Sequence, residues 1–200
     1  MQINLLQVGS FEVNCVILTK AERAWIVDPG AEPGRIAAFL EARHLKPAAI
    51  LLTHAHFDHI GGVPELRRRY PDISIGISAA DAAIVSHPFN QYPPDYPPVK
   101  IPGTVPPEEL VKELGGEVLS TPGHTPGGVS YYFAAEKLLL SGDTLFKRAF
   151  GRTDLAGGDE TVLINSLKTL GKLPQETRVL PGHGPETTIK DEAWVCAPAR

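Results

Sequence analysis

The sequence predicts an α+β fold, in which strands and helices are mixed along the chain. The chain has 200 residues, a length that suits one globular domain. Hydrophobic residues make up 42% of it and charged residues 21%, as in ordinary globular domains. The period of the hydrophobic pattern switches repeatedly between about 2 and about 3.6 residues, which indicates both strands and helices. We therefore expect a single α+β domain over residues 1–200.

The first half of the chain opens with strands and then alternates helices with strands. Gly9-Ser10 is a turn signal between two alternating apolar segments, so the opening strands are expected to be antiparallel. Proline suits the first position of a helix and a cation suits its last turn, which predicts a helix from Pro33 to His44. The expected strands are 3–8, 13–19, 24–28, 48–53 and 73–77, and the other expected helices are 64–70 and 79–86.

A proline-rich segment from Pro88 to Pro107 separates the two halves. Eight of its twenty residues are proline, which excludes regular structure. The segment also carries Phe89, Tyr92 and Tyr96, so we expect an ordered surface loop, with an interdomain linker as the alternative. We expect residues 87–101 to form one wall of a substrate cleft. After a short helix at 108–114 we expect strands at 117–121, 129–133, 137–141 and 177–180, and a helix at 159–171.

The net charge, the lack of long apolar stretches and the first twenty residues exclude several classes of function. The formal net charge is −4, and Arg67-Arg68-Arg69 is the only basic run, so we expect neither nucleic acid nor a membrane surface as a partner. No apolar stretch approaches a spanning helix, and the first twenty residues lack signal-peptide features, which predicts a cytoplasmic protein. Cys15 and Cys196 lie far apart and are expected to be free thiols.

Ligand-type side chains gather directly after the strand expected at 48–53. The segment reads Thr53-His54-Ala55-His56-Phe57-Asp58-His59-Ile60-Gly61-Gly62. Imidazoles at alternating positions 54 and 56 can point the same way, whereas Asp58 and His59 lie beyond a bend and can face a second point. A catalytic tetrahedral site keeps three protein ligands and one open position, so four ligands here favour two metal ions.

Three later strands also end in ligand-type residues. They are His124 in Thr121-Pro122-Gly123-His124, Asp143 in Gly142-Asp143-Thr144, and His183 in Pro181-Gly182-His183. A glycine adjoins each of them, as expected where the backbone approaches an ion closely. Asp28, in Val27-Asp28-Pro29-Gly30, is more easily explained as a carboxylate that forms a turn or supports a ligand than as a ligand itself.

In these motifs the sequence resembles the metallo-β-lactamase-fold hydrolases, and within them the glyoxalase II, or hydroxyacylglutathione hydrolase, enzymes. The similarity runs from about Ile3 to His183. It implies a four-layer αββα sandwich with the metals at one edge of two packed sheets. It also implies one metal held by His54, His56 and His124, a second held by Asp58, His59 and His183, and Asp143 as a bridge between them. Two zinc ions are the expected cofactors, and the same residue types accept iron or manganese.

The resemblance implies a hydrolase of thioesters such as S-lactoylglutathione. Two ions lower the pKa of a shared water to about 7, and Asp58 and Asp143 are the expected catalytic carboxylates that hold and orient it. A thiolate leaves without strong acid assistance, and no separate general acid is evident. Lys147, Arg148 and Arg152 are candidate partners for a substrate carboxylate.

The sequence also differs from the larger glyoxalase II enzymes. Those enzymes add a C-terminal helical domain that supplies basic groups for glutathione, whereas this sequence runs 17 residues past His183. We therefore expect the acyl half of the substrate to be recognised better than the glutathione half.

Other metal chemistries are compatible with the same residues. Gly151 to Asp154 resembles the persulfide dioxygenases, in which His54, His124 and Asp143 would form a mononuclear iron site open to oxygen. A lactonase or a metal-dependent nuclease is a further alternative, although the acidic net charge makes a nuclease the least expected. The sequence does not indicate an oligomeric state.

Overall fold

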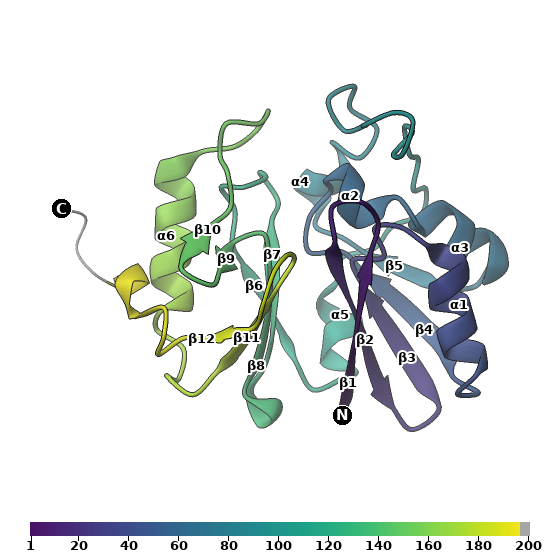
Figure 1. The fold of residues 1–200 in the computed structure, drawn as a ribbon, viewed down its shortest axis with the longest axis horizontal. Coiled ribbons are helices and arrows are strands. Elements are labelled where there is room, and N and C mark those ends of the chain that lie inside the picture. The colour runs from purple at the N-terminus through teal and green to yellow at the C-terminus, as the bar shows by residue number, and fades with distance from the viewer. Residues whose placement is uncertain (197–200) are drawn as a thin grey trace.

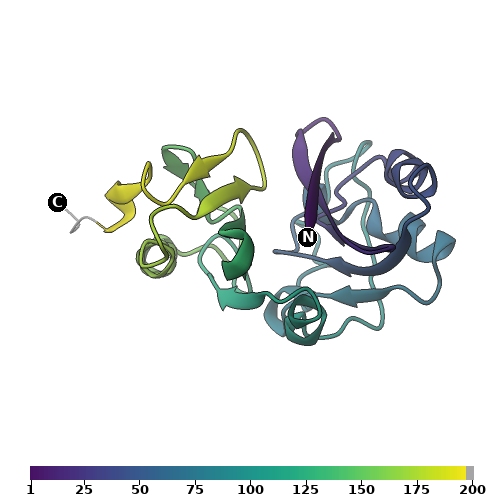
Figure 2. The same cartoon turned by 90° about the horizontal axis from the view of Figure 1, so that it is seen from below.

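The computed structural model describes residues 1–196, except for the side chain of Cys196, which lies outside the described part. Two five-stranded sheets face each other, and helices cover their outer faces (Figure 1). In the view from below, α6 (Glu160–Leu170) lies on one outer flank and α1 (Pro33–Glu41) on the other (Figure 2). The layers therefore follow the order helix, sheet, sheet, helix, as the resemblance implies.

The first sheet is built by the N-terminal half of the chain. Its strand order is the chain order, and β1, β2 and β3 are antiparallel, as expected. β3, β4 and β5 are parallel, because helices cross over between them. The strands are β1 (Gln2–Val8), β2 (Val13–Lys20), β3 (Arg23–Val27), β4 (Lys46–Leu51) and β5 (Ser74–Gly76), and the helices of this half are α1, α2 (Phe57–Ile60), α3 (Val63–Arg69) and α4 (Ala79–Ala82).

The second sheet is built by the C-terminal half, in the order β12-β11-β8-β7-β6. β8 and β11 are parallel, with α6 as the crossover helix. Its strands are β6 (Glu117–Ser120), β7 (Val129–Phe133), β8 (Leu138–Gly142), β11 (Arg178–Pro181) and β12 (Thr187–Thr188); this half also holds the hairpin β9 (Leu145–Phe146) with β10 (Ala149–Phe150), helix α5 (Glu108–Lys112), and the short helices η1 (Ala134–Glu136) and η2 (Ala193–Cys196).

Side chains alternate between the layers with the strand period of two. Tyr131 and Phe133 of β7 pack between the two sheets, whereas Tyr132 packs beneath α6. In β2, Val16 faces the second sheet and Ile17 faces the cluster beneath α1. Both faces of the central strands are therefore apolar, which explains why these segments read as continuous hydrophobic runs.

Two expectations about helix ends were wrong, and one helix was not expected. The first helix ends at Glu41, because His44 adopts a left-handed conformation (φ 53°) in a Schellman turn, in which Leu45 N–H bonds Leu40 O. The helix expected at 79–86 is only α4, because the backbone continues as three-residue turns from Ile84. The helix α2 inside the His-rich segment was not expected.

The proline-rich segment has the irregular structure that was expected. Within the described chain, residues 88–107 form no helix or strand, and an isolated bridge between Tyr92 and Tyr96 closes a small loop. Tyr96 is buried, so this loop is anchored to the body of the protein. None of the helices in residues 1–196 is long and apolar enough to cross a bilayer.

Candidate metal centre

Four strand ends deliver the seven predicted ligand residues to one edge of the two sheets. His54 and His56 lie in the extended segment after β4, and Asp58 and His59 lie in the buried helix α2. The other three follow β6, β8 and β11 of the second sheet: they are His124, Asp143 and His183. The structure thus brings all seven side chains together, with contributions from both sheets.

The first group consists of His54, His56 and His124, whose ring nitrogens lie within 4.8 Å of one another. His56 Nδ1 is 2.9 Å from His124 Nε2, and the buried His54 Nε2 has no hydrogen-bond partner in the described chain. Ligands about 2.0–2.1 Å from a tetrahedral ion are about 3.4 Å apart, so this spacing suits one ion.

The second group consists of Asp58, His59 and His183. His59 Nε2 and His183 Nε2 are 3.3 Å apart, and His183 Nε2 lies 3.2 Å from Asp58 Oδ2. These separations equal the edges of a coordination tetrahedron, as in the first group.

Asp143 lies between the two groups. Its Oδ1 is 3.4 Å from His59 Nε2, and its Oδ2 is 3.6 Å from both His124 Nε2 and His183 Nε2. Oδ1 is buried and has no hydrogen-bond partner among the described residues. A carboxylate placed in this way lies within reach of both groups.

Oxygen acceptors orient the imidazoles toward the cluster. His124 Nδ1 lies 2.7 Å from Arg152 O, His183 Nδ1 lies 2.8 Å from Phe11 O, and each ring can donate a hydrogen bond there. The proton then occupies Nδ1, which leaves the lone pair of Nε2 free for a metal. The donor set, its spacing and its tautomers therefore fit metal ions.

Asp28 supports the cluster from behind. Its Oδ2 is 3.1 Å from His59 Nδ1, and its carboxylate accepts hydrogen bonds from the Thr53 N–H and hydroxyl. Thr53 Oγ1 also lies 3.0 Å from His54 Nδ1. Although Asp28, His54 and His59 also form a compact group, the Asp28 oxygens already accept these hydrogen bonds and face the Nδ1 sides of the rings. This geometry agrees with a supporting role.

Asp81 was missed by the sequence analysis and connects two ligand-bearing loops. This fully buried carboxylate accepts hydrogen bonds from Ala55 N–H, the Thr125 hydroxyl and Gly127 N–H at 2.7–2.9 Å. Burial raises the pKa of Asp81, while these three donors oppose that rise. The only sequence signal was the Ser78-x-x-Asp81 spacing at the start of a helix.

Two histidines of the first group, His54 and His56, have lowered pKa values. Burial and the nearby ring of His59 lower the pKa of His54 well below its ordinary value. Burial and His124 lower the pKa of His56 to about 3. Both rings therefore keep their lone pairs at neutral pH, as metal ligands must.

The second group is rich in negative charge. Burial favours neutral His59, but Asp143, Asp58 and Asp28 outweigh it and raise its pKa to about 10. Burial likewise favours protonated Asp58, but His59 and His183 lower its pKa to about 2. A positive charge is therefore strongly favoured at this position.

Glycine is required where the backbone touches the cluster. A Cβ atom on Gly182 would clash with Asp143 Oδ1 and with the ring of His59. A Cβ on Gly30 would clash with the backbone carbonyl of Asp58. These two glycines let separate loops close around the seven side chains.

Four aromatic rings lie beside the seven candidate ligands. We term them the aromatic cluster: Phe11, Phe57, Tyr92 and Tyr96. Neighbouring ring centroids are 5.1–5.8 Å apart. Tyr92 is 53% exposed and Phe11 is 40% exposed, so the cluster presents apolar surface to solvent. Because Phe11 O lies 2.8 Å from His183 Nδ1, this surface adjoins the candidate metal centre.

The other residues predicted to bind substrate lie outside the aromatic cluster. Phe89 packs on His87 at a centroid distance of 4.3 Å and has no ring contact with the aromatic cluster in the described chain. Arg152 forms a two-pronged ion pair with Asp154, so its guanidinium is already occupied. Lys147 and Arg148 are exposed between β9 and β10, and Phe146 of β9 lies 6.3 Å from the ring of His183.

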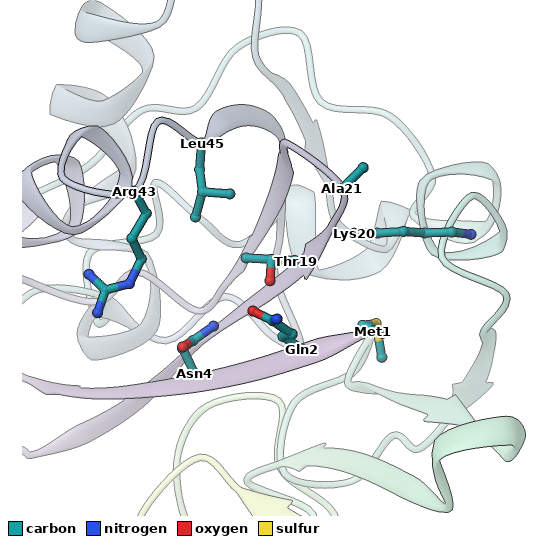
Figure 3. A pocket seen from close by; sticks show the side chains of 8 residues that line it. All are labelled: Met1, Gln2, Asn4, Thr19, Lys20, Ala21, Arg43 and Leu45. Carbon is teal, nitrogen blue, oxygen red and sulfur yellow. The ribbon is translucent and has the colours of Figure 1, made fainter.

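A cavity of about 590 Å³ lies elsewhere, and none of the seven candidate ligands lines it. Figure 3 shows its polar lining, with Asn4, Thr19, Lys20 and Arg43 among the side chains. Beside His54, His124 and Asp143 there is only a void of about 10 Å³, which is the size of a single water site.

Known proteins share this fold. The sequence model of the Metallo-beta-lactamase superfamily matches residues 8–183. The probable metallo-hydrolase YqgX of Bacillus subtilis is 38% identical over 96% of this chain and 94% of its own length. The hydroxyacylglutathione hydrolase GloC of Haemophilus influenzae is 32% identical over 96% of this chain and 95% of its own. The crystal structure of TTHA1623 in a di-iron-bound form superposes with a TM-score of 0.86 at 38% identity, covering 95% of this chain and 96% of that one.

The chain belongs to the metallo-β-lactamase superfamily. The αββα sandwich implied by the sequence motifs is thereby confirmed, and the His/Asp cluster lies at the sheet edge where it was expected.

Proposed function

We propose that this protein is a dinuclear metal-dependent hydrolase of thioesters. The observation that carries the proposal is the position of Asp143, whose carboxylate lies 3.6 Å from His124 of the first group and 3.4–3.6 Å from His59 and His183 of the second. A mononuclear site would leave the compact group of Asp58, His59 and His183 without a role. The similarity to a relative named as a hydroxyacylglutathione hydrolase supports a thioester as the substrate.

The seven candidate ligands divide between two ions in this proposal. His54, His56 and His124 hold the first ion, and Asp58, His59 and His183 hold the second, with Asp143 shared. Bound ions supply Lewis acidity and a water of lowered pKa. Zinc suits the His and Asp donors, and iron or manganese is compatible with the same set.

The residues of the chain orient the reaction. Asp58 lies among the candidate ligands of the second ion, where a bound cation would keep its carboxylate ionised, so it can accept a hydrogen bond from the attacking water. Asp28 and the Phe11 carbonyl fix the rings of His59 and His183 in one tautomer. A thiolate of pKa about 8.5 leaves without a strong acid, which favours thioesters over amides.

The aromatic cluster forms one wall of the substrate site in this proposal. Phe11 and Tyr92 present exposed ring surface next to His183, which suits the apolar part of an acyl thioester. Lys147 and Arg148 are exposed cations without an ion pair in residues 1–196, so both are candidate partners for a distant substrate carboxylate.

Elemental analysis combined with two activity assays tests the proposal. We expect two metal ions per chain, hydrolysis of S-lactoylglutathione, and no oxygen uptake with glutathione persulfide. One iron per chain together with oxygen uptake would instead assign a persulfide dioxygenase that uses His54, His124 and Asp143. Two ions without hydrolysis of any acyl thioester would contradict the substrate class.

A further inference from the structure

A second groove lies on the outer side of the first sheet, between α3 and the end of the proline-rich loop. Its volume is about 380 Å³, within the range of about 300–1,000 Å³ that is typical of small-molecule sites. Its lining combines apolar and cationic residues and includes none of the candidate metal ligands: Val63, Pro64, Arg67, Arg68, Pro71, Ile75, Lys100, Ile101 and Pro102.

The cationic side chains in and near this groove differ in whether a carboxylate pairs with them. Arg69, which belongs to the same basic run but lies outside the groove, is paired with Glu41 at 2.5 Å. Arg68 lies 4.0 Å from Glu65, and both side chains are largely exposed. Within residues 1–196, neither Arg67 nor Lys100 forms an ion pair with a carboxylate.

Arg67 is the most informative of these residues. Its side chain is half-buried, and its Nη1 is buried without a hydrogen-bond partner in the described chain. Leaving a buried N–H unpaired costs free energy, and a guanidinium without a counter-charge costs more. A Cβ atom placed on Gly103 would lie 3.6 Å from its Nη2, so the end of the loop passes next to this guanidinium.

The groove therefore combines uncompensated positive charge with an apolar floor, in a protein whose net charge is −4. We propose that it binds a small phosphorylated molecule with an apolar body, and that a nucleoside phosphate has the matching chemistry. Arg67 and Arg68 pair with the phosphates through guanidinium groups, which can bind two phosphate oxygens at once, and Lys100 adds the positive charge of its ammonium group. Ile75, Ile101 and the three prolines cover the apolar body.

Titration of the metal-loaded protein with ADP tests this site, with amide chemical shifts as the readout. We expect shifts at Val63, Ile75 and Ile101, and binding at least about tenfold tighter for ADP than for adenosine or inorganic phosphate alone. Higher salt weakens the binding, because its electrostatic part is screened. Shifts confined to residues around His54 and His183 would show that ADP binds only the metal centre, and would overturn the proposal.

Matched variants locate the charge that matters. Lys100→Ala, on an exposed loop, and Arg67→Gln should each weaken ADP binding at least about fivefold. Arg69→Ala is the control on the same helix, and it should change the affinity less than about twofold, because Arg69 is paired with Glu41. Equal affinity of the wild-type protein and of both Lys100→Ala and Arg67→Gln would reject the site, whatever the activity of the metal centre.

Discussion

Asp28 Oδ2 lies 3.1 Å from His59 Nδ1, so a carboxylate that is not itself a proposed ligand fixes the orientation of one that is. The same carboxylate binds the Thr53 hydroxyl, which in turn lies 3.0 Å from His54 Nδ1. One buried acid therefore orients a histidine in each of the two groups. This arrangement resembles the carboxylate–histidine–metal triads of other metal sites.

Replacing Asp28 should weaken metal binding without unfolding the protein. Asp28→Asn tolerates the left-handed backbone (φ 49°) but removes the charge that faces His59. We expect metal affinity to fall by about 10–100-fold, which is typical for such supporting partners. Metal content after dialysis against a weak chelator measures this loss, and undiminished content would show that His59 needs no supporting charge.

Replacing Asp143 should disturb both metal sites, because its oxygens face both groups. Asp143→Ala is expected to hold less than one ion per chain, whereas His183→Ala should lose only the second. Elemental analysis of both variants, purified in parallel, makes the comparison. If Asp143→Ala keeps one tightly bound ion, Asp143 does not bridge the sites.

Replacing Asp81 should lower stability rather than remove a ligand. Asp81→Ala leaves Ala55 N–H, Gly127 N–H and the Thr125 hydroxyl unpaired, at about 1–3 kcal/mol for each buried group. We expect about 3 kcal/mol or more of destabilisation, a fall in Tm of about 6–12 °C. Asp95→Ala, on the exposed loop, is the control with no expected shift, and equal Tm values for the two variants would refute the structural role.

The aromatic cluster should affect substrate binding more than metal content. Tyr92→Ala removes an exposed ring, and we expect KM for an acyl thioester to rise about 3–10-fold, since an aromatic pair contributes about 0.5–1.5 kcal/mol. Phe89→Ala is the control in the same loop, because Phe89 packs on His87 instead. Similar KM values for both variants and the wild type would assign the cluster to packing alone.

The surface carboxylate of Glu32 should make the stability of the fold depend on pH. The Gly9 N–H and the Arg35 guanidinium lower the pKa of Glu32 below its ordinary value of 4.5. Since the folded pKa is below the unfolded one, this stabilisation is present above about pH 4.5 and is lost as the pH falls below it. Glu32→Gln should therefore lower Tm by at most about 4 °C at pH 7, for a pair worth up to about 1 kcal/mol, and by less at pH 3. A constant Tm difference across this range would exclude the charge as the cause.

The sequence predicted the cluster better than its surroundings, for a physical reason. Ligand residues lie at strand ends in short motifs, so local spacing is enough to identify them. The contacts of Asp81 join residues 26 and 44 positions away, and no local pattern reveals such pairs. At His44 a local pattern was misleading. A basic residue type is favoured in the last turn of a helix, but α1 ends at Glu41 and the His44 backbone is left-handed.

Four of the seven candidate ligands come from the N-terminal half of the fold and three from the C-terminal half, and this has a mechanical consequence. His59 and His183 are 124 positions apart in the chain and their Nε2 atoms lie 3.3 Å apart. An ion held by both would act as a cross-link that closes a very long loop, and the entropic benefit of a cross-link increases with loop length. Catalysis and the packing of the two sheets would then depend on the same metal ligands. Removing the ions with a chelator would weaken the contact between the sheets as well as stop turnover.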